Sequence, residues 1–69
     1  MTIYISLLSG KAQADMKASV EAEIISVEDN QYFYANGNTI SEAIDKLAKR
    51  FEHDTGDIFP NHYDLTTIL

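Results

Sequence analysis

The sequence contains no cysteine and no tryptophan, only one proline and three glycines, and few basic residues. Without cysteine the chain has neither disulfides nor thiolate metal ligands, so its 69 residues must rely on a hydrophobic core. A chain this short buries only about 60% of its unfolded surface, and self-association is a common way to bury more. The sequence therefore predicts one domain over residues 1–69 and leaves a homodimer open.

Long hydrophobic runs are also missing. The apolar stretch at residues 3–8 is too short to cross a membrane or to form the core of a signal peptide. No nucleophile elbow, phosphate-binding loop or HExxH zinc motif occurs either. We therefore expect a cytoplasmic protein that is not an enzyme, with no catalytic residues, no cofactor and no membrane partner.

Basic residues are scarce, with five lysines and arginines against eleven aspartates and glutamates, and the net charge is −6. Such a surface repels phosphate backbones, because binding to nucleic acid depends on clustered Lys and Arg. Direct binding to nucleic acid is therefore not expected. A host protein with a basic surface is the natural complement.

Alternation of apolar and polar residues predicts strands at 2–8, 17–27 and 32–35, and more weakly at 62–69. The adjacent Ile24 and Ile25 interrupt this alternation and suggest either a bulge in the second strand or a change of its buried face. Residues 28–31 have turn chemistry, which predicts a hairpin between the second and third strands. Residues 9–16 form a polar connection with room for a short helical turn.

The strongest local pattern lies at residues 39–55 and predicts a helix. Thr39 and Glu42 have the spacing of an N-terminal capping box, and Gly56 fits a C-terminal stop. Apolar residues recur at helical spacing, at Ile40, Ala43, Ile44, Leu47, Ala48 and Phe51. Together the elements predict an α+β fold, a three- to four-stranded antiparallel sheet (β-β-β-α-β) with one amphipathic helix on one face.

The charges are unevenly distributed along the chain. In residues 42–53 three acids balance three bases, so the whole excess of −6 lies on the strands and loops. Glu21 and Glu23 should project from one strand face about 6.6 Å apart, similar to successive phosphates on a nucleic-acid strand. Tyr4, Tyr32 and Tyr34 are expected on the same face.

A sheet face that combines tyrosines with carboxylates suits recognition of a basic protein surface, because tyrosine supplies contact area at low entropic cost. An ordinary solvated sheet face, on which polar residues and tyrosine are common, is the alternative. The predicted partner-binding residues are Glu21, Glu23, Glu28, Asp29, Tyr32 and Tyr34.

His53, Asp54, Asp57 and His62 lie close together in sequence and resemble a metal or acid–base cluster. Their spacing matches no known ligand pattern, and a zinc site needs three or four convergent ligands. We therefore expect a solvated helix end followed by a polar loop, and no metal.

Residues 31–49, which include Thr39-Ile40-Ser41-Glu42-Ala43, resemble the strand–turn–helix of HicB-type antitoxins. This resemblance implies an acidic protein that neutralises a small basic ribonuclease toxin, although the family's central hairpin and its DNA-binding module have no counterpart here. From Ala18 to Leu69 the order of elements also resembles the small phage inhibitor of bacterial RNA polymerase. That resemblance implies an acidic phage protein that docks on a basic channel of a host enzyme.

The leading hypothesis is a small acidic inhibitor encoded by a phage or mobile element. It would act as a nucleic-acid mimic and occlude the basic site of a host nucleic-acid-handling or defence protein. The alternatives are a HicB-like antitoxin that neutralises a small basic toxin, and an oligomeric protein that sequesters a small ligand.

Overall fold

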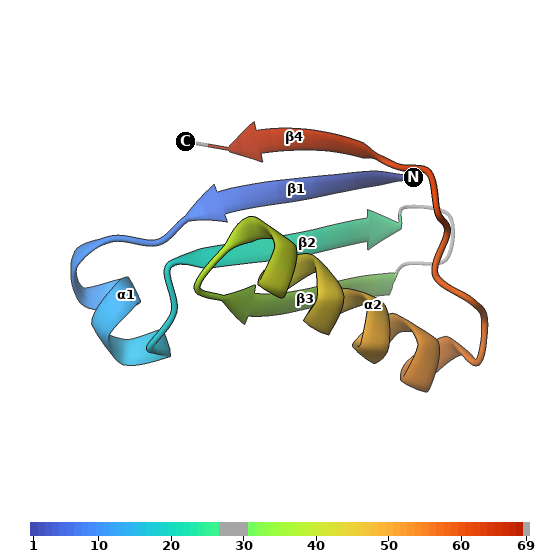
Figure 1. The fold of residues 1–69 in the computed structure, drawn as a ribbon, viewed down its shortest axis with the longest axis horizontal. Coiled ribbons are helices and arrows are strands. Elements are labelled where there is room, and N and C mark those ends of the chain that lie inside the picture. The colour runs from blue at the N-terminus through green and yellow to red at the C-terminus, as the bar shows by residue number, and fades with distance from the viewer. Residues whose placement is uncertain (27–30, 69) are drawn as a thin grey trace.

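The computed structural model describes residues 1–26 and 31–68. In chain order the elements are β1 (Thr2–Leu7), α1 (Gly10–Met16), β2 (Val20–Ser26), β3 (Gln31–Gly37), α2 (Ile40–Thr55) and β4 (Asp64–Ile68). The strands form one sheet in the order β3-β2-β1-β4, and α2 lies across one face, over β2 and β3 (Figure 1). The predicted α+β class is confirmed, and the expected helical turn in the first connection is α1.

The last strand differs from the expected antiparallel pattern. β1 pairs antiparallel with β2, and β2 with β3, but β4 pairs parallel with β1. The reason is the helical crossover, since α2 runs back along the sheet against the direction of β3 (Figure 1). The chain therefore enters β4 at the end of the sheet where β1 begins, and the two strands run in the same direction.

The α2 helix begins and ends where local chemistry predicts. The Thr39 hydroxyl oxygen accepts a hydrogen bond from the Glu42 backbone N–H at 3.1 Å. Gly56 adopts a left-handed conformation (φ +77°), and its N–H donates to the Glu52 carbonyl at 2.9 Å. The Glu42 carboxylate lies 3.2 Å from the Lys46 ammonium, one turn further along the helix.

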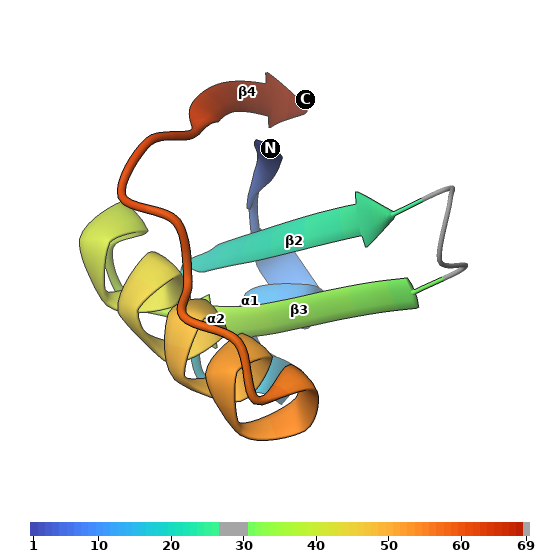
Figure 2. The same cartoon turned by 90° about the vertical axis from the view of Figure 1, so that its right-hand side faces the viewer.

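We call the sheet face under α2 the inner face. Its side chains and those of the helix form the core, which contains Ile3, Ile5, Val20, Ala22, Ile24, Phe33, Ala43, Ile44, Leu47 and Phe59. The segment 56–63 passes alongside α2 on its way to β4 (Figure 2) and contributes Phe59. The Phe51 ring lies edge-on to two other rings, with its centroid 5.4 Å from that of Phe33 and 5.5 Å from that of Phe59.

The prediction of a bulge or a change of buried face at Ile24 and Ile25 is wrong. The β2–β3 register runs without interruption from Val20 opposite Gly37 to Ser26 opposite Gln31. Simple alternation continues through the doublet, so Ile24 is buried on the inner face while Ile25 is 53% exposed on the other. The structure therefore places a large apolar side chain on the solvent side of the sheet.

Candidate protein-binding face

The outer face, defined as the sheet face opposite α2, carries the acidic and aromatic residues predicted for partner binding. Register places Glu23 of β2 between Tyr4 of β1 and Tyr34 of β3. Glu21 lies two residues before Glu23 on the same strand and face, and Tyr32 lies two residues before Tyr34. A carboxylate is thus flanked by an aromatic ring on both neighbouring strands.

The remaining two predicted residues, Glu28 and Asp29, lie outside the described residues. Ile25, which was not among the predicted residues, is opposite Tyr32 in the β2–β3 register and adds an exposed apolar side chain to this face. Strict alternation along β2 was the signal that could have found it.

A hydrogen bond joins the aromatic and acidic residues of the outer face. The Tyr32 hydroxyl donates to the Glu23 carboxylate at 2.5 Å, although the Tyr32 side chain is half exposed. This bond stabilises the protonated phenol, and together with partial burial and the nearby negative charge it raises the pKa of Tyr32 from 10.0 to about 12. The contact holds the Glu23 carboxylate in a fixed position beside the ring.

Tyr34 is held in place by a residue from the other side of the sheet. The Arg50 guanidinium of α2 donates to the Tyr34 carbonyl oxygen at 2.9 Å and lies 5.3 Å from the centre of the Tyr34 ring. The Tyr32 and Tyr34 ring centroids are 5.6 Å apart. Arg50 therefore reaches around the edge of β3 and orders a pair of adjacent tyrosines.

Glu21 experiences unfavourable electrostatics on this face. Partial burial, followed by the negative charge of Glu23, raises the pKa of the Glu21 carboxyl above its ordinary value of 4.5. Both causes disfavour the charged form. A cation brought between the two carboxylates would offset the repulsion, so the pair is better suited to a positively charged group than to bulk solvent.

A hollow of about 280 Å³ adjoins the outer face at the end where β1 begins. It is lined by Met1, Thr2, Tyr4, Ile24 and Ile25. Its aliphatic side chains, one aromatic ring and one threonine give this end of the face a partly apolar recess next to the acidic row.

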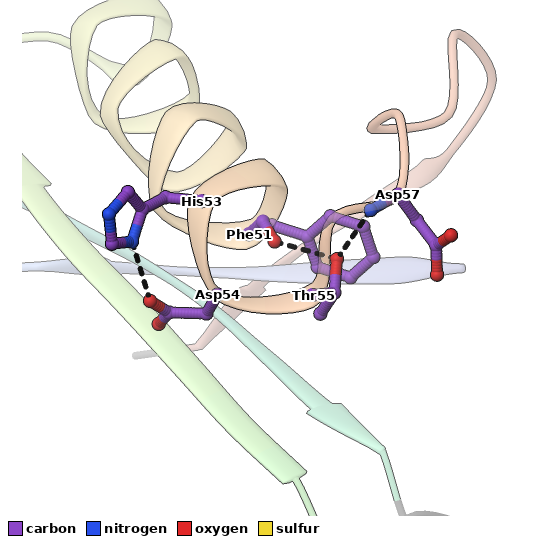
Figure 3. Close-up of polar contacts among 5 residues, drawn as sticks. All are labelled: Phe51, His53, Asp54, Thr55 and Asp57. Atoms are coloured by element: carbon purple, nitrogen blue, oxygen red, sulfur yellow. Dashed lines mark hydrogen bonds and ion pairs between the residues drawn. The ribbon is translucent and has the colours of Figure 1, made fainter.

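His53, Asp54 and Asp57 lie around the C-terminal end of α2 (Figure 3). His53 Nδ1 lies 3.2 Å from the Asp54 carboxylate, both on exposed side chains. The Thr55 hydroxyl donates to the Phe51 carbonyl at 2.7 Å and accepts from the Asp57 N–H at 3.1 Å, while the Asp57 carboxylate points away.

Glu52 lies near the C-terminus of α2, where the macrodipole favours cations, and one contact explains its presence there. The Glu52 carboxylate accepts a hydrogen bond from the Phe59 N–H at 3.0 Å, which fastens the following loop to the helix. Within residues 1–26 and 31–68, no three His, Asp or Glu side chains are grouped so that they could hold a metal ion.

Comparison with known proteins gave no match to a family model, to a curated protein or to a solved structure. In the part of the chain that the structure describes, no helix has both the length and the apolar character needed to cross a membrane.

Proposed function

We propose that this chain is a small acidic binding protein whose outer face docks on a basic protein surface. The observation that carries this proposal is the Glu23 carboxylate flanked by Tyr4 and Tyr34 on the neighbouring strands. Tyrosine rings supply large contact areas with few torsions to freeze, and carboxylates pair with the lysines and arginines of a partner.

The side chains of the outer face are also pre-organised in the unbound protein. Tyr32 fixes the Glu23 carboxylate, and Arg50 fixes the Tyr34 backbone and ring. Groups that are already ordered lose less conformational freedom on association, which favours affinity. The recess beside Tyr4 and Ile25 offers space for an apolar side chain of the partner.

The biochemical role that fits this face is inhibition by occlusion. A net charge of −6 directs the protein towards basic sites, which in nucleic-acid-handling and defence proteins are the sites that bind phosphates. Carboxylates on the outer face would compete there with the nucleic acid. We therefore propose an inhibitor of such a protein, of the kind that phages and mobile elements encode.

The HicB-like antitoxin hypothesis uses the same face and differs only in its partner, a small basic toxin. Both hypotheses require the acidic outer face to bind a basic surface, but they name different partners. Identification of the bound protein therefore distinguishes them.

Charge reversal with a matched control tests the proposal. Glu21→Lys combined with Glu23→Lys reverses the outer face, while Asp15→Lys combined with Asp45→Lys makes the same change at exposed positions in α1 and α2. Each substitution adds two charges, so both variants change the net charge from −6 to −2. Comparison of the two variants therefore separates the effect of where the charges are changed from the effect of the total net charge.

The immobilised proteins are used to capture a partner from a bacterial lysate at low salt. The captured protein is then purified, and displacement of a labelled nucleic acid from it is followed by fluorescence anisotropy. We expect the wild type and the Asp15/Asp45 variant to displace the nucleic acid, and the Glu21/Glu23 variant to bind at least about tenfold more weakly, a loss of about 1.4 kcal/mol. Equal displacement by all three proteins would show that the outer face is not the binding surface.

A further inference from the structure

The outward edge of β4 carries backbone groups without a neighbouring strand in the described part of the chain. The Asp64 N–H donates to the Met1 carbonyl at 3.0 Å, so the backbone groups of Asp64 point towards β1. Successive residues of a strand point alternately to its two sides, so the N–H and C=O groups of Leu65 and Thr67 point away from the sheet. These two residues form an open hydrogen-bonding edge.

The other edge of the sheet is covered at Tyr34 by a charged side chain. At β3 the Arg50 guanidinium donates to the Tyr34 carbonyl and covers the Tyr34 ring. Charged side chains at an edge are a common way to prevent pairing with another chain. Between Asp64 and Ile68, by contrast, there is no proline, lysine or arginine, and residues 64–67 are all exposed.

We propose that a second copy of this chain pairs antiparallel with β4, about a two-fold axis that passes through Thr66. In this register Leu65 lies opposite Thr67 of the second copy, and Thr67 opposite its Leu65. Both residues have outward backbone groups, so the pairing forms four hydrogen bonds and leaves the β1–β4 ladder intact. The two Thr66 residues meet as a non-hydrogen-bonded pair, and threonine pairs are favourable across strands.

Charge favours pairing at this edge over contact between two outer faces. Asp64 is the only charged residue of β4, and antiparallel pairing places the two Asp64 residues at opposite ends of the strand pair, roughly 13 Å apart along the strand at about 3.3 Å per residue. Contact between two outer faces would instead bring Glu21 and Glu23 of both copies together. Pairing through the β4 edge thus brings two acidic chains together with less repulsion than contact between their outer faces.

Burial of apolar surface supports the same pairing. Leu65 lies on the inner face of the edge strand β4, away from β2 and β3, over which α2 lies, and its side chain is 53% exposed. In the proposed dimer it packs beside Thr67 of the second copy. The interface is short, so we expect a dimer of micromolar affinity or weaker rather than an obligate one.

A cysteine substitution tests the two-fold position directly, because the chain contains no cysteine. In a non-hydrogen-bonded antiparallel pair the Cα atoms lie about 4.5 Å apart, within the range that a disulfide accepts. Thr66→Cys should therefore form a covalent dimer on mild oxidation. Ser41→Cys, at an exposed position of α2, is the matched control and should remain largely monomeric.

Equilibrium measurements complete the test. Sedimentation equilibrium from about 5 to about 500 µM should show the wild-type mass rising from 7.7 kDa towards twice that value. Thr67→Pro removes one outward N–H and should weaken the dimer at least about tenfold, while Thr67→Val keeps the N–H and should behave as the wild type. Circular dichroism verifies that the proline variant is folded. A wild type that stays monomeric throughout, or a Thr66→Cys protein that dimerises no faster than the Ser41→Cys control, would overturn the proposal.

Discussion

Replacement of Gly37 by alanine should push α2 away from the sheet. Gly37 ends β3 and is buried directly beneath the first turn of α2. A Cβ atom at this position would lie 2.7 Å from the Ala43 backbone nitrogen and 3.0 Å from the Glu42 carbonyl carbon. Both atoms belong to the helix backbone, so no change of side-chain rotamer relieves the overlap.

The size of the effect follows from these distances. Ordinary contact begins at 3.4 Å, so the difference from 2.7 Å requires the helix to retreat by about 0.7 Å. The helix moves as a unit and carries the fully buried Leu47 with it, so the shift loosens the core. Overpacking of this kind costs about 1–3 kcal/mol, against a total stability of about 3–10 kcal/mol for a domain of this length.

Urea unfolding followed by circular dichroism measures this loss, and a thermal scan should show a midpoint lower by about 5–20 °C. Ala43→Gly provides a control, because it removes the neighbouring methyl group and leaves the contacted backbone in place. It should not rescue Gly37→Ala, and the coupling between the two changes should stay below about 0.5 kcal/mol. A Gly37→Ala protein within about 0.5 kcal/mol of the wild type would refute this account of the β3–α2 contact.

Two further predictions concern the outer face and the core. In a phenolate absorbance titration one tyrosine, Tyr32, should ionise near pH 12, and Glu23→Ala should return it towards pH 10, because the carboxylate is the main cause of the raised pKa. The Tyr32–Glu23 contact should therefore stabilise the fold below about pH 10 and lose its effect as the pH rises through about 12; a titration unchanged by Glu23→Ala would contradict this. Leu47→Ala should lower the free energy of unfolding, measured in urea, by about 2–5 kcal/mol, because the Leu47 side chain is fully buried. Ile58→Ala, at a side chain that is 86% exposed, should change it by less than about 0.5 kcal/mol. Equal losses of stability in the two variants would show that burial is not the cause.

Features determined by neighbouring residues were predictable from the sequence. The Thr39 cap and the Gly56 stop follow from contacts within a few residues of each other. Helical spacing also predicted the apolar stripe of α2, of which Ala43, Ile44 and Leu47 are buried. Ile40, in the first turn, is instead 43% exposed. Alternation placed Glu21 and Glu23 on one face, and the structure brings Tyr32 and Tyr34 to that face as well. Their role in binding stays a prediction.

Features determined by distant residues were not predictable. A strand was expected near residues 62–69 and is found at Asp64–Ile68, but alternation says nothing about which strand it joins or in which direction. The contact between Arg50 and Tyr34 spans 16 residues and depends on how α2 crosses β3, so no local pattern indicates it. The prediction of a bulge at Ile24 and Ile25 is wrong because the alternation continues through both isoleucines, one of which is buried and the other exposed.

The two proposed interactions should respond to salt in opposite directions. Binding of the outer face to a basic partner is an attraction between unlike charges, so it should weaken as screening increases between about 50 mM and about 500 mM salt. Dimerisation through β4 brings together two chains of net charge −6 through a nearly uncharged edge, so screening should strengthen it. A salt series on the isolated protein, followed by the same series with the captured partner, therefore tests each interaction separately. If salt weakened the dimer, acidic residues at its interface would be paired with basic residues of the second copy. That result would contradict pairing through β4.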